Sequence, residues 1–164
     1  MEVVPSLYNL FLRMKQEGYN VSGLPANAQE LAKMIQAQGA VFNSYAEGAF
    51  DEFMKNGNPE LITKEQYESW VKESLLPEKY AEVVAADGEF PGNYMVTSDG
   101  CLGGARLQFG NIVLMPQNAA GSGDNTFQVV HGTNAAPPHT YITSYVRMQH
   151  GFKADALIHF GTHG

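Results

Sequence analysis

The sequence predicts an α/β protein with a mainly helical first part and a second part that contains a βαβ unit and a largely parallel sheet. Three observations predict this arrangement. Apolar residues recur at helical spacing through residues 1–90. Charged residues fall from 21 in residues 1–90 to six in residues 91–164, whereas glycine rises from six to 11. An apolar, strand-like run follows a predicted helix near residue 160. We therefore divide the chain into a helical segment, 1–90, and an α/β segment, 91–164.

The helical segment opens with apolar residues at helical spacing from Leu7 to Met14, and Gly18 can end this helix. Further helices are predicted to begin at Asn27, Phe42, Thr63 and Pro77. Two of these positions, Asn27 and Thr63, are followed three residues later by Glu or Gln, which is the spacing of a capping box. We expect the apolar side chains of these helices to form a core.

The α/β segment changes to shorter runs of β-type residues. The predicted elements are strands 93–97, 106–109 and 111–115, a loop 117–138, a helix 139–150 and a strand 154–160. Asp99-Gly100 is a hairpin turn signal after the first of these strands. Because the last strand is apolar apart from Asp155 and His159, we expect both of its faces to be covered, as in a parallel sheet.

The charge and the apolar runs exclude two classes of partner. The formal net charge is −7 and no basic run occurs, so we expect no nucleic-acid partner. The longest aliphatic run covers only residues 112–115, far short of the roughly 20 residues of a membrane span. The single cysteine, Cys101, cannot form an internal disulfide. This favours a reducing compartment, and we expect the cytoplasm.

The α/β segment has too few charges for a freely solvated small domain. Only six charged residues occur in 91–164, where about a quarter of residues is usual. The sequence also stops at His163-Gly164, directly after the predicted final strand. We therefore expect the chain to be a fragment of a larger multidomain subunit, and we expect the rest of that parent polypeptide to cover this segment.

All five histidines lie between residues 131 and 163. In a right-handed βαβ unit, the loop, the helix start and the end of the final strand meet at the carboxyl edge of the sheet, where α/β proteins bind ligands. Four histidines belong at that edge: His131, His139, His159 and His163. Imidazole can accept a proton near neutral pH or ligate a metal, so we expect a functional cluster. His150, at the other end of the helix, is assigned no chemistry.

Three motifs carry a resemblance to a known family. Residues 154–164, Ala-Asp-Ala-Leu-Ile-His-Phe-Gly-Thr-His-Gly, resemble a segment of the cobaltochelatase large subunit, CobN, and of the large porphyrin-binding subunit of magnesium chelatase. Residues 137–142 resemble the family's Pro-Pro-x-His-x-Tyr helix start, and residues 109–117 resemble its strand that ends in Pro-Gln. The three motifs occur in the family's order and together cover residues 109–164.

The resemblance implies a large subunit that binds a tetrapyrrole and inserts cobalt or magnesium into the ring. The implied substrate is hydrogenobyrinic acid diamide or a protoporphyrin-like macrocycle, within cobalamin or related tetrapyrrole biosynthesis. ATP would be hydrolysed by separate AAA+ partner subunits, and no Walker motif occurs in this sequence. We expect the fragment alone to be inactive.

The implied site residues fall into two groups. His139, His159 and His163 are predicted to be catalytic, as bases for the ring N–H protons or as transient ligands, and His159 and His163 are the predicted metal ligands. The predicted tetrapyrrole-binding residues are Gln117, Asn118, His131, Gly161, Thr162 and Gly164. Two alternatives stay open: a zinc-dependent hydrolase that uses the same histidines, and a non-catalytic interaction domain.

Overall fold

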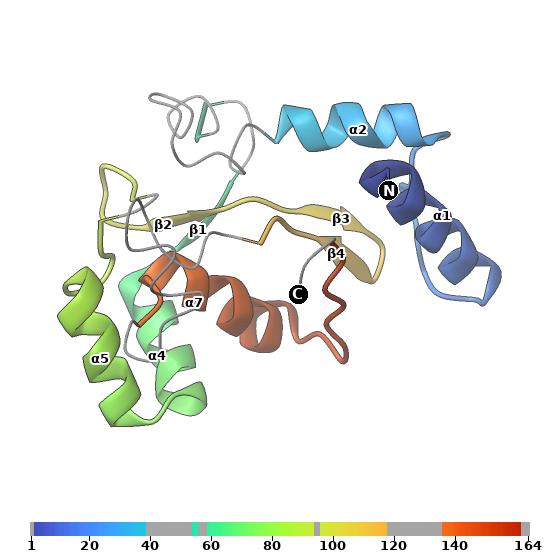
Figure 1. Ribbon diagram of the computed structural model, residues 1–164. Helices are drawn as coiled ribbons and strands as arrows, with labels where there is room; N and C mark the ends of the chain where they lie inside the picture. The colour runs from blue at the N-terminus through green and yellow to red at the C-terminus, as the bar shows by residue number, and fades with distance from the viewer. Residues whose placement is uncertain (1, 39–53, 56–58, 94–95, 118–135, 162–164) are drawn as a thin grey trace. The chain divides into compact units, whose positions relative to one another are not determined.

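The structure is a computed structural model that describes residues 2–38, 54–55, 59–93, 96–117 and 136–161 (Figure 1). Nearly all of the helix predicted to begin at Phe42, and most of the predicted loop 117–138, lie outside these residues. Among the helices that are described, none combines the length and the hydropathy that a membrane crossing requires.

The chain forms two compact units. Unit 1 comprises Met1–Pro59, Ala105–Pro116 and Ile158–Gly164, and unit 2 comprises Glu60–Gly104 and Gln117–Leu157. Each unit takes residues from both sides of the boundary predicted at residue 90. The division into segments 1–90 and 91–164 therefore stays a prediction about the domains of a longer chain.

Unit 1 combines two helices with a short hairpin. The helices are α1 (Val3–Gln16) and α2 (Ala28–Ala37), and the hairpin pairs β3 (Leu107–Phe109) with β4 (Ile112–Leu114) in antiparallel register. Gly110 makes the turn between the strands with φ of +59°, a backbone conformation that glycine adopts without strain. The buried core of the unit consists of Leu7, Tyr8, Phe11, Val21, Leu31 and Phe109.

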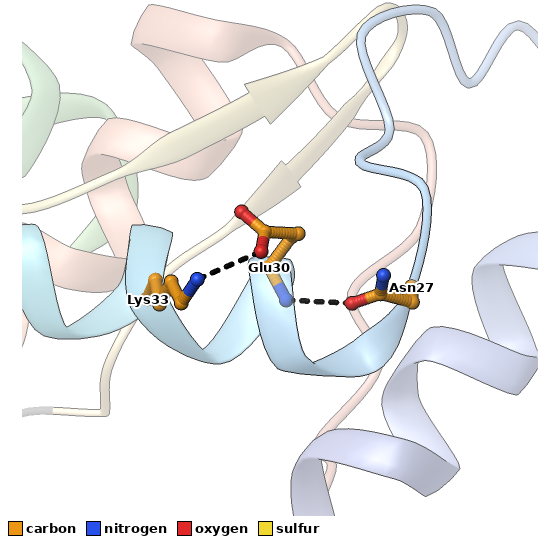
Figure 2. Close-up of polar contacts among 3 residues, drawn as sticks. All are labelled: Asn27, Glu30 and Lys33. Carbon is orange, nitrogen blue, oxygen red and sulfur yellow. Dashed lines mark hydrogen bonds and ion pairs between the residues drawn. The ribbon is translucent and has the colours of Figure 1, made fainter.

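The beginning of α2 is fixed by a side-chain cap, as the sequence predicted. The backbone N–H of Glu30 donates to Oδ1 of Asn27 at 2.9 Å, and Nζ of Lys33 lies 2.8 Å from Oε1 of Glu30 (Figure 2). The cap satisfies a backbone donor of the first turn that has no partner within the helix. An exposed ion pair such as Lys33–Glu30 contributes little to stability, so we assign the Asn27 cap the larger share of the stabilisation.

Unit 2 packs its helices around a second small sheet. Its elements are β1 (Glu60–Ile62), α4 (Lys64–Ser74), α5 (Pro77–Asp87), β2 (Leu102–Gly104), α7 (His139–Val146) and the π-helix η1 (Arg147–Phe152). β1 and β2 are antiparallel, with Glu60 opposite Gly104 and Ile62 opposite Leu102. The core contains Ile62, Tyr67, Val71, Val83, Phe90, Leu102, Ile142 and Val146.

Several local predictions are confirmed in unit 2. Thr63 and Gln66 form a complete capping box at the start of α4, and α5 begins at Pro77. Gly100 has φ of +73° in the predicted turn, and Val96 and Leu102 are bridged across that turn. With mixed helices and short strands, the predicted α/β class is confirmed.

The predicted sheet pairing differs from the structure. Both sheets that the structure describes are two-stranded and antiparallel, so the parallel βαβ unit is not present in this part of the chain. Residues 154–160 are not a strand: all but Ala154 are exposed, with Leu157 at 54% and Ile158 at 60% of their full accessibility. A strand needs a neighbouring strand for its backbone groups, and the described residues supply none here.

Candidate functional site

His139, the first residue of α7, lies in the centre of unit 2 and is fully buried. Its Nδ1 is 2.8 Å from the Tyr67 hydroxyl, and its Nε2 is 2.9 Å from the Gly88 carbonyl oxygen. The rings of Tyr67, Tyr80 and Phe90 surround it edge-on, at centroid distances of 5.3, 6.2 and 6.0 Å. Both ring nitrogens of His139 are therefore engaged within the core.

These two hydrogen bonds define the tautomer of His139. A carbonyl oxygen only accepts, so Nε2 must carry the proton that it donates to Gly88. With a single proton on the ring, Nδ1 then accepts a hydrogen bond from the Tyr67 hydroxyl. Burial raises the pKa of Tyr67, and Tyr80 and Asp87 nearby raise it further, so this phenol stays protonated and can donate.

Asp87 holds the start of α7 from the end of α5. Its Oδ2 accepts the backbone N–H of His139 at 3.0 Å, and its Oδ1 accepts the backbone N–H of Asn93 at 3.3 Å. A carboxylate at a helix N-terminus is favoured by the helix dipole. A Cβ at Gly92 would overlap the Asp87 carboxylate, so glycine is required for this loop to close over it. Sequence reasoning missed Asp87, because nothing in its local sequence separates it from the other acids at helix ends.

Arg147 is a buried charge at the first residue of η1, with its side chain 3% exposed. Its Nε lies 3.6 Å from Oε2 of Glu60, and its guanidinium occupies the space next to Gly104, which pairs with Glu60 across the sheet. A buried charge without a partner would be strongly destabilising, so Arg147 needs the ion pair with Glu60. The absence of a side chain at Gly104 leaves the space in which the guanidinium lies. The signal in the sequence was an arginine between Val146 and Met148 in a charge-poor segment.

One side of α7 carries two partly exposed tyrosines that contact each other. The hydroxyls of Tyr141 and Tyr145 are 3.2 Å apart, and Nε2 of Gln117 donates to the Tyr145 hydroxyl at 3.4 Å. Gln117 is one of the predicted tetrapyrrole-binding residues. Its two tyrosine neighbours were not among the predicted site residues, although Tyr141 belongs to the motif at residues 137–142.

The predicted histidine cluster is only partly described. His139 and Gln117 belong to unit 2, whereas His159 and Gly161 belong to unit 1 and are exposed. His131, His163, Asn118, Thr162 and Gly164 lie outside the described residues. The convergence of the histidines, and the metal ligation predicted for His159 and His163, therefore stay predictions.

His150 has two partners in α4. Its Nε2 is 2.6 Å from the Ser74 hydroxyl, and its Nδ1 is 3.3 Å from Oε2 of Glu73. These contacts join η1 to the last turn of α4. Within the described part of the chain, no group of three or more His, Cys, Asp or Glu side chains lies close enough together to hold a metal ion.

Comparison with known proteins gives one consistent result. All of residues 1–164 match the CobN/Magnesium Chelatase family. The chain is 30% identical to magnesium-chelatase subunit ChlH of Oryza sativa subsp. indica over 166 aligned residues, which is 100% of this chain and 11% of that protein. It is 30% identical to the aerobic cobaltochelatase subunit CobN of Pseudomonas aeruginosa over 156 residues, covering 95% of this chain and 12% of that one.

A solved structure agrees with the sequence comparison. The catalytic subunit of cobaltochelatase from Mycobacterium tuberculosis superimposes with a TM-score of 0.63 at 26% identity, covering 86% of this chain and 11% of that one. The chain thus spans about one-eighth or less of the length of these relatives. The match over its whole length shows that the chain belongs to the CobN/magnesium chelatase family.

Proposed function

We propose that this chain is part of the large subunit of an ATP-dependent metal chelatase, and that it contributes to binding a tetrapyrrole and inserting cobalt or magnesium. The observation that carries the proposal is the match over residues 1–164 to a family that contains both cobaltochelatase and magnesium chelatase subunits. Membership of this family supports metal insertion as the reaction class. In that reaction the metal ion is a substrate and not a resident cofactor. The family match does not favour the alternative of a zinc-dependent hydrolase.

The proposed chemistry rests on His159 and His163 rather than on His139. Insertion requires that the ring N–H protons leave and that the hydrated metal loses water, and an accessible imidazole can assist either step. His159 is exposed and close in sequence to His163. His139 is fully buried with both nitrogens hydrogen-bonded, which supports a role in holding α7 in place.

The proposal includes partners beyond this chain. AAA+ ATPase subunits would hydrolyse ATP, and the substrate would be hydrogenobyrinic acid diamide or a protoporphyrin-like ring. The rest of the parent polypeptide would complete the site, in the cytoplasm. The small share of the relatives' length that this chain spans supports a shared site. We accordingly propose that the 164-residue chain alone is inactive.

Two histidine variants of the full-length subunit test this function. With the ATPase partners, ATP, metal and tetrapyrrole present, we expect His163→Ala to abolish metal insertion while tetrapyrrole affinity and melting temperature change little. We expect His159→Ala to reduce insertion in the same assay. His150→Ala is the matched control, because its ring contacts Ser74 and Glu73 and should leave insertion intact at a temperature where the variant is folded. Full insertion by both His159→Ala and His163→Ala would refute the proposed roles.

The non-catalytic alternative makes a different prediction. An interaction domain would bind neither a tetrapyrrole nor a metal, and loss of its histidines would leave insertion by the full-length subunit unchanged. Turnover by the isolated chain with ATP would contradict the proposal that the site is shared with the rest of the polypeptide. Tightly bound stoichiometric zinc in the purified chain would instead support the hydrolase.

A further inference from the structure

The face of α7 that is not part of the core of unit 2 presents two tyrosines one helical turn apart. The rings of Tyr141 and Tyr145 are 5.1 Å apart between centroids and tilted by 53°, and both side chains are partly exposed. Their neighbours along the helix, Ile142 and Val146, are buried in the core. Side chains four residues apart lie one above the other on a helix, so the two rings form a continuous aromatic surface.

A third polar group joins this surface from outside the helix. Gln117 is exposed, and its Nε2 donates to the Tyr145 hydroxyl at 3.4 Å. The Tyr145 hydroxyl also lies 3.2 Å from that of Tyr141. The amide and the two phenols therefore form a row of neutral hydrogen-bonding groups along the edge of an aromatic patch, here called the tyrosine patch (Gln117, Tyr141 and Tyr145).

The tyrosine patch presents hydrogen-bond donors at neutral pH. Burial and the hydrogen bond to Tyr141 together raise the pKa of Tyr145 to about 12, so this phenol remains neutral. When Tyr145 donates to the oxygen of Tyr141, the hydroxyl proton of Tyr141 can be donated to an incoming acceptor. No proton is transferred in this arrangement, so these groups can bind and orient a ligand without acting as acid or base.

We propose that the tyrosine patch is a subsite for the tetrapyrrole, in which the tyrosine rings pack against the flat macrocycle and the row of donors binds a carboxylate or amide substituent at its rim. The inference rests on the proposed function and adds the residues and the chemistry of recognition. A planar macrocycle offers an extended apolar face, which suits aromatic side chains. Neutral donors suit amide and carboxylate oxygens, whereas phosphate groups are usually bound by arginine or lysine.

Porphyrin binding by the full-length subunit tests the proposal. Deuteroporphyrin IX, which carries two propionates, is the probe, and its Soret absorbance reports binding. Tyr141→Phe keeps the ring and removes the hydroxyl, so we expect binding about 2- to 10-fold weaker, the worth of one hydrogen bond. Tyr141→Leu also removes the ring and should weaken binding further.

Tyr19→Phe and Tyr19→Leu are the controls, because Tyr19 is an exposed tyrosine of unit 1 and should not affect binding. Thermal unfolding verifies that each variant is folded.

The outcomes separate this inference from the proposed function. Weaker binding by the Tyr141 variants, with unchanged binding by the Tyr19 variants, supports the tyrosine patch. Equal affinity for all five proteins overturns the tyrosine patch and leaves tetrapyrrole binding by the subunit in place. Equal losses at Tyr19 and Tyr141 also overturn it, because the effect would not be specific to this surface. If the unchanged subunit does not bind deuteroporphyrin IX, the proposed tetrapyrrole binding fails, and the tyrosine patch fails with it.

Discussion

The Tyr67 hydroxyl donates a hydrogen bond of 2.8 Å to Nδ1 of His139, and the two rings meet edge to face at 77°. Both side chains are fully buried, and they join α4 to the first residue of α7. Because Nε2 of the same ring donates to Gly88, the imidazole also joins both helices to the end of α5. His139 is therefore the polar centre of unit 2.

We predict that His139→Ala strongly destabilises the protein. The change removes a buried ring and leaves the Tyr67 hydroxyl and the Gly88 carbonyl without these partners, so we expect a loss of about 3–5 kcal/mol in the free energy of unfolding. Urea denaturation measures it. The control is His159→Ala at an exposed position, with an expected change below about 1 kcal/mol. Similar values for the two variants would contradict the central role of His139.

The folded protein should lose stability at alkaline pH. Burial, together with the hydrogen bond to Tyr141, raises the pKa of Tyr145 to about 12 from a usual value of 10.0, and burial also raises the pKa of Tyr67. The folded state thus holds these phenolic protons more tightly than the unfolded state, so their stabilisation is complete below pH 10 and is lost as the pH rises through 12. Denaturation across this range should show a falling free energy of unfolding.

Tyr145→Phe is the control for the alkaline transition. The Tyr145 phenol has a higher pKa in the folded state than in the unfolded state, and this difference makes stability fall with pH. Without this phenol, the free energy of unfolding should fall less steeply. Absorbance of tyrosinate near 295 nm provides a second measurement, in which part of the phenols should ionise only above pH 10 in the folded chain. A stability that is constant up to pH 12 would contradict the prediction.

We predict that Gly104→Ala disturbs the buried ion pair of unit 2. A Cβ at this position would overlap Nη1 of Arg147, whose guanidinium is held against the sheet beside Glu60. The expected cost is about 1–3 kcal/mol in the free energy of unfolding, typical of overpacking in a core. Gly151→Ala is the matched control, because a Cβ there would meet the Trp70 ring at 3.3 Å, which needs only a small shift. A cost at position 104 no greater than at position 151 would show that Arg147 can move freely.

The isolated chain should bind a hydrophobic dye through residues 154–160. Leu157, Ile158 and Phe160 are exposed by 54%, 60% and 38%, which gives a short apolar stretch open to solvent. Dye fluorescence should fall in the double variant Leu157→Ser, Ile158→Ser. Leu76→Ser, at an exposed leucine outside this stretch, should leave it nearly unchanged. Equal fluorescence in all three proteins would contradict the assignment of the dye site.

Features encoded by neighbouring residues were predictable from the sequence. The capping box of Thr63 and Gln66 needs only a threonine and a glutamine three residues apart, and it forms as expected. The start of α7 at His139 was also predicted, since two prolines precede it. The fold class was correct for the same reason, because helix and strand periods are local patterns.

Features that depend on distant residues were not predictable. The apolar run at 154–160 has the composition of a buried strand, yet a strand also needs a pairing partner that its own sequence cannot specify. His139 was placed correctly along the chain, but its partners Tyr67 and Gly88 belong to other elements. The expected meeting of four histidines was based on a parallel sheet that the described residues do not form, and with His131 and His163 outside those residues it stays a prediction.

The division of the chain has a consequence for its biosynthesis. Unit 1 needs the hairpin at Ala105–Pro116, which a ribosome makes only after the whole first segment of unit 2, and unit 2 needs Gln117–Leu157, which follows that hairpin. Phe11 cannot reach its partner Phe109 until the hairpin has emerged from the exit tunnel. The apolar faces of α1 and α2 that pack on the hairpin thus stay open until the hairpin has been made, so unit 1 cannot fold in strict order from the N-terminus.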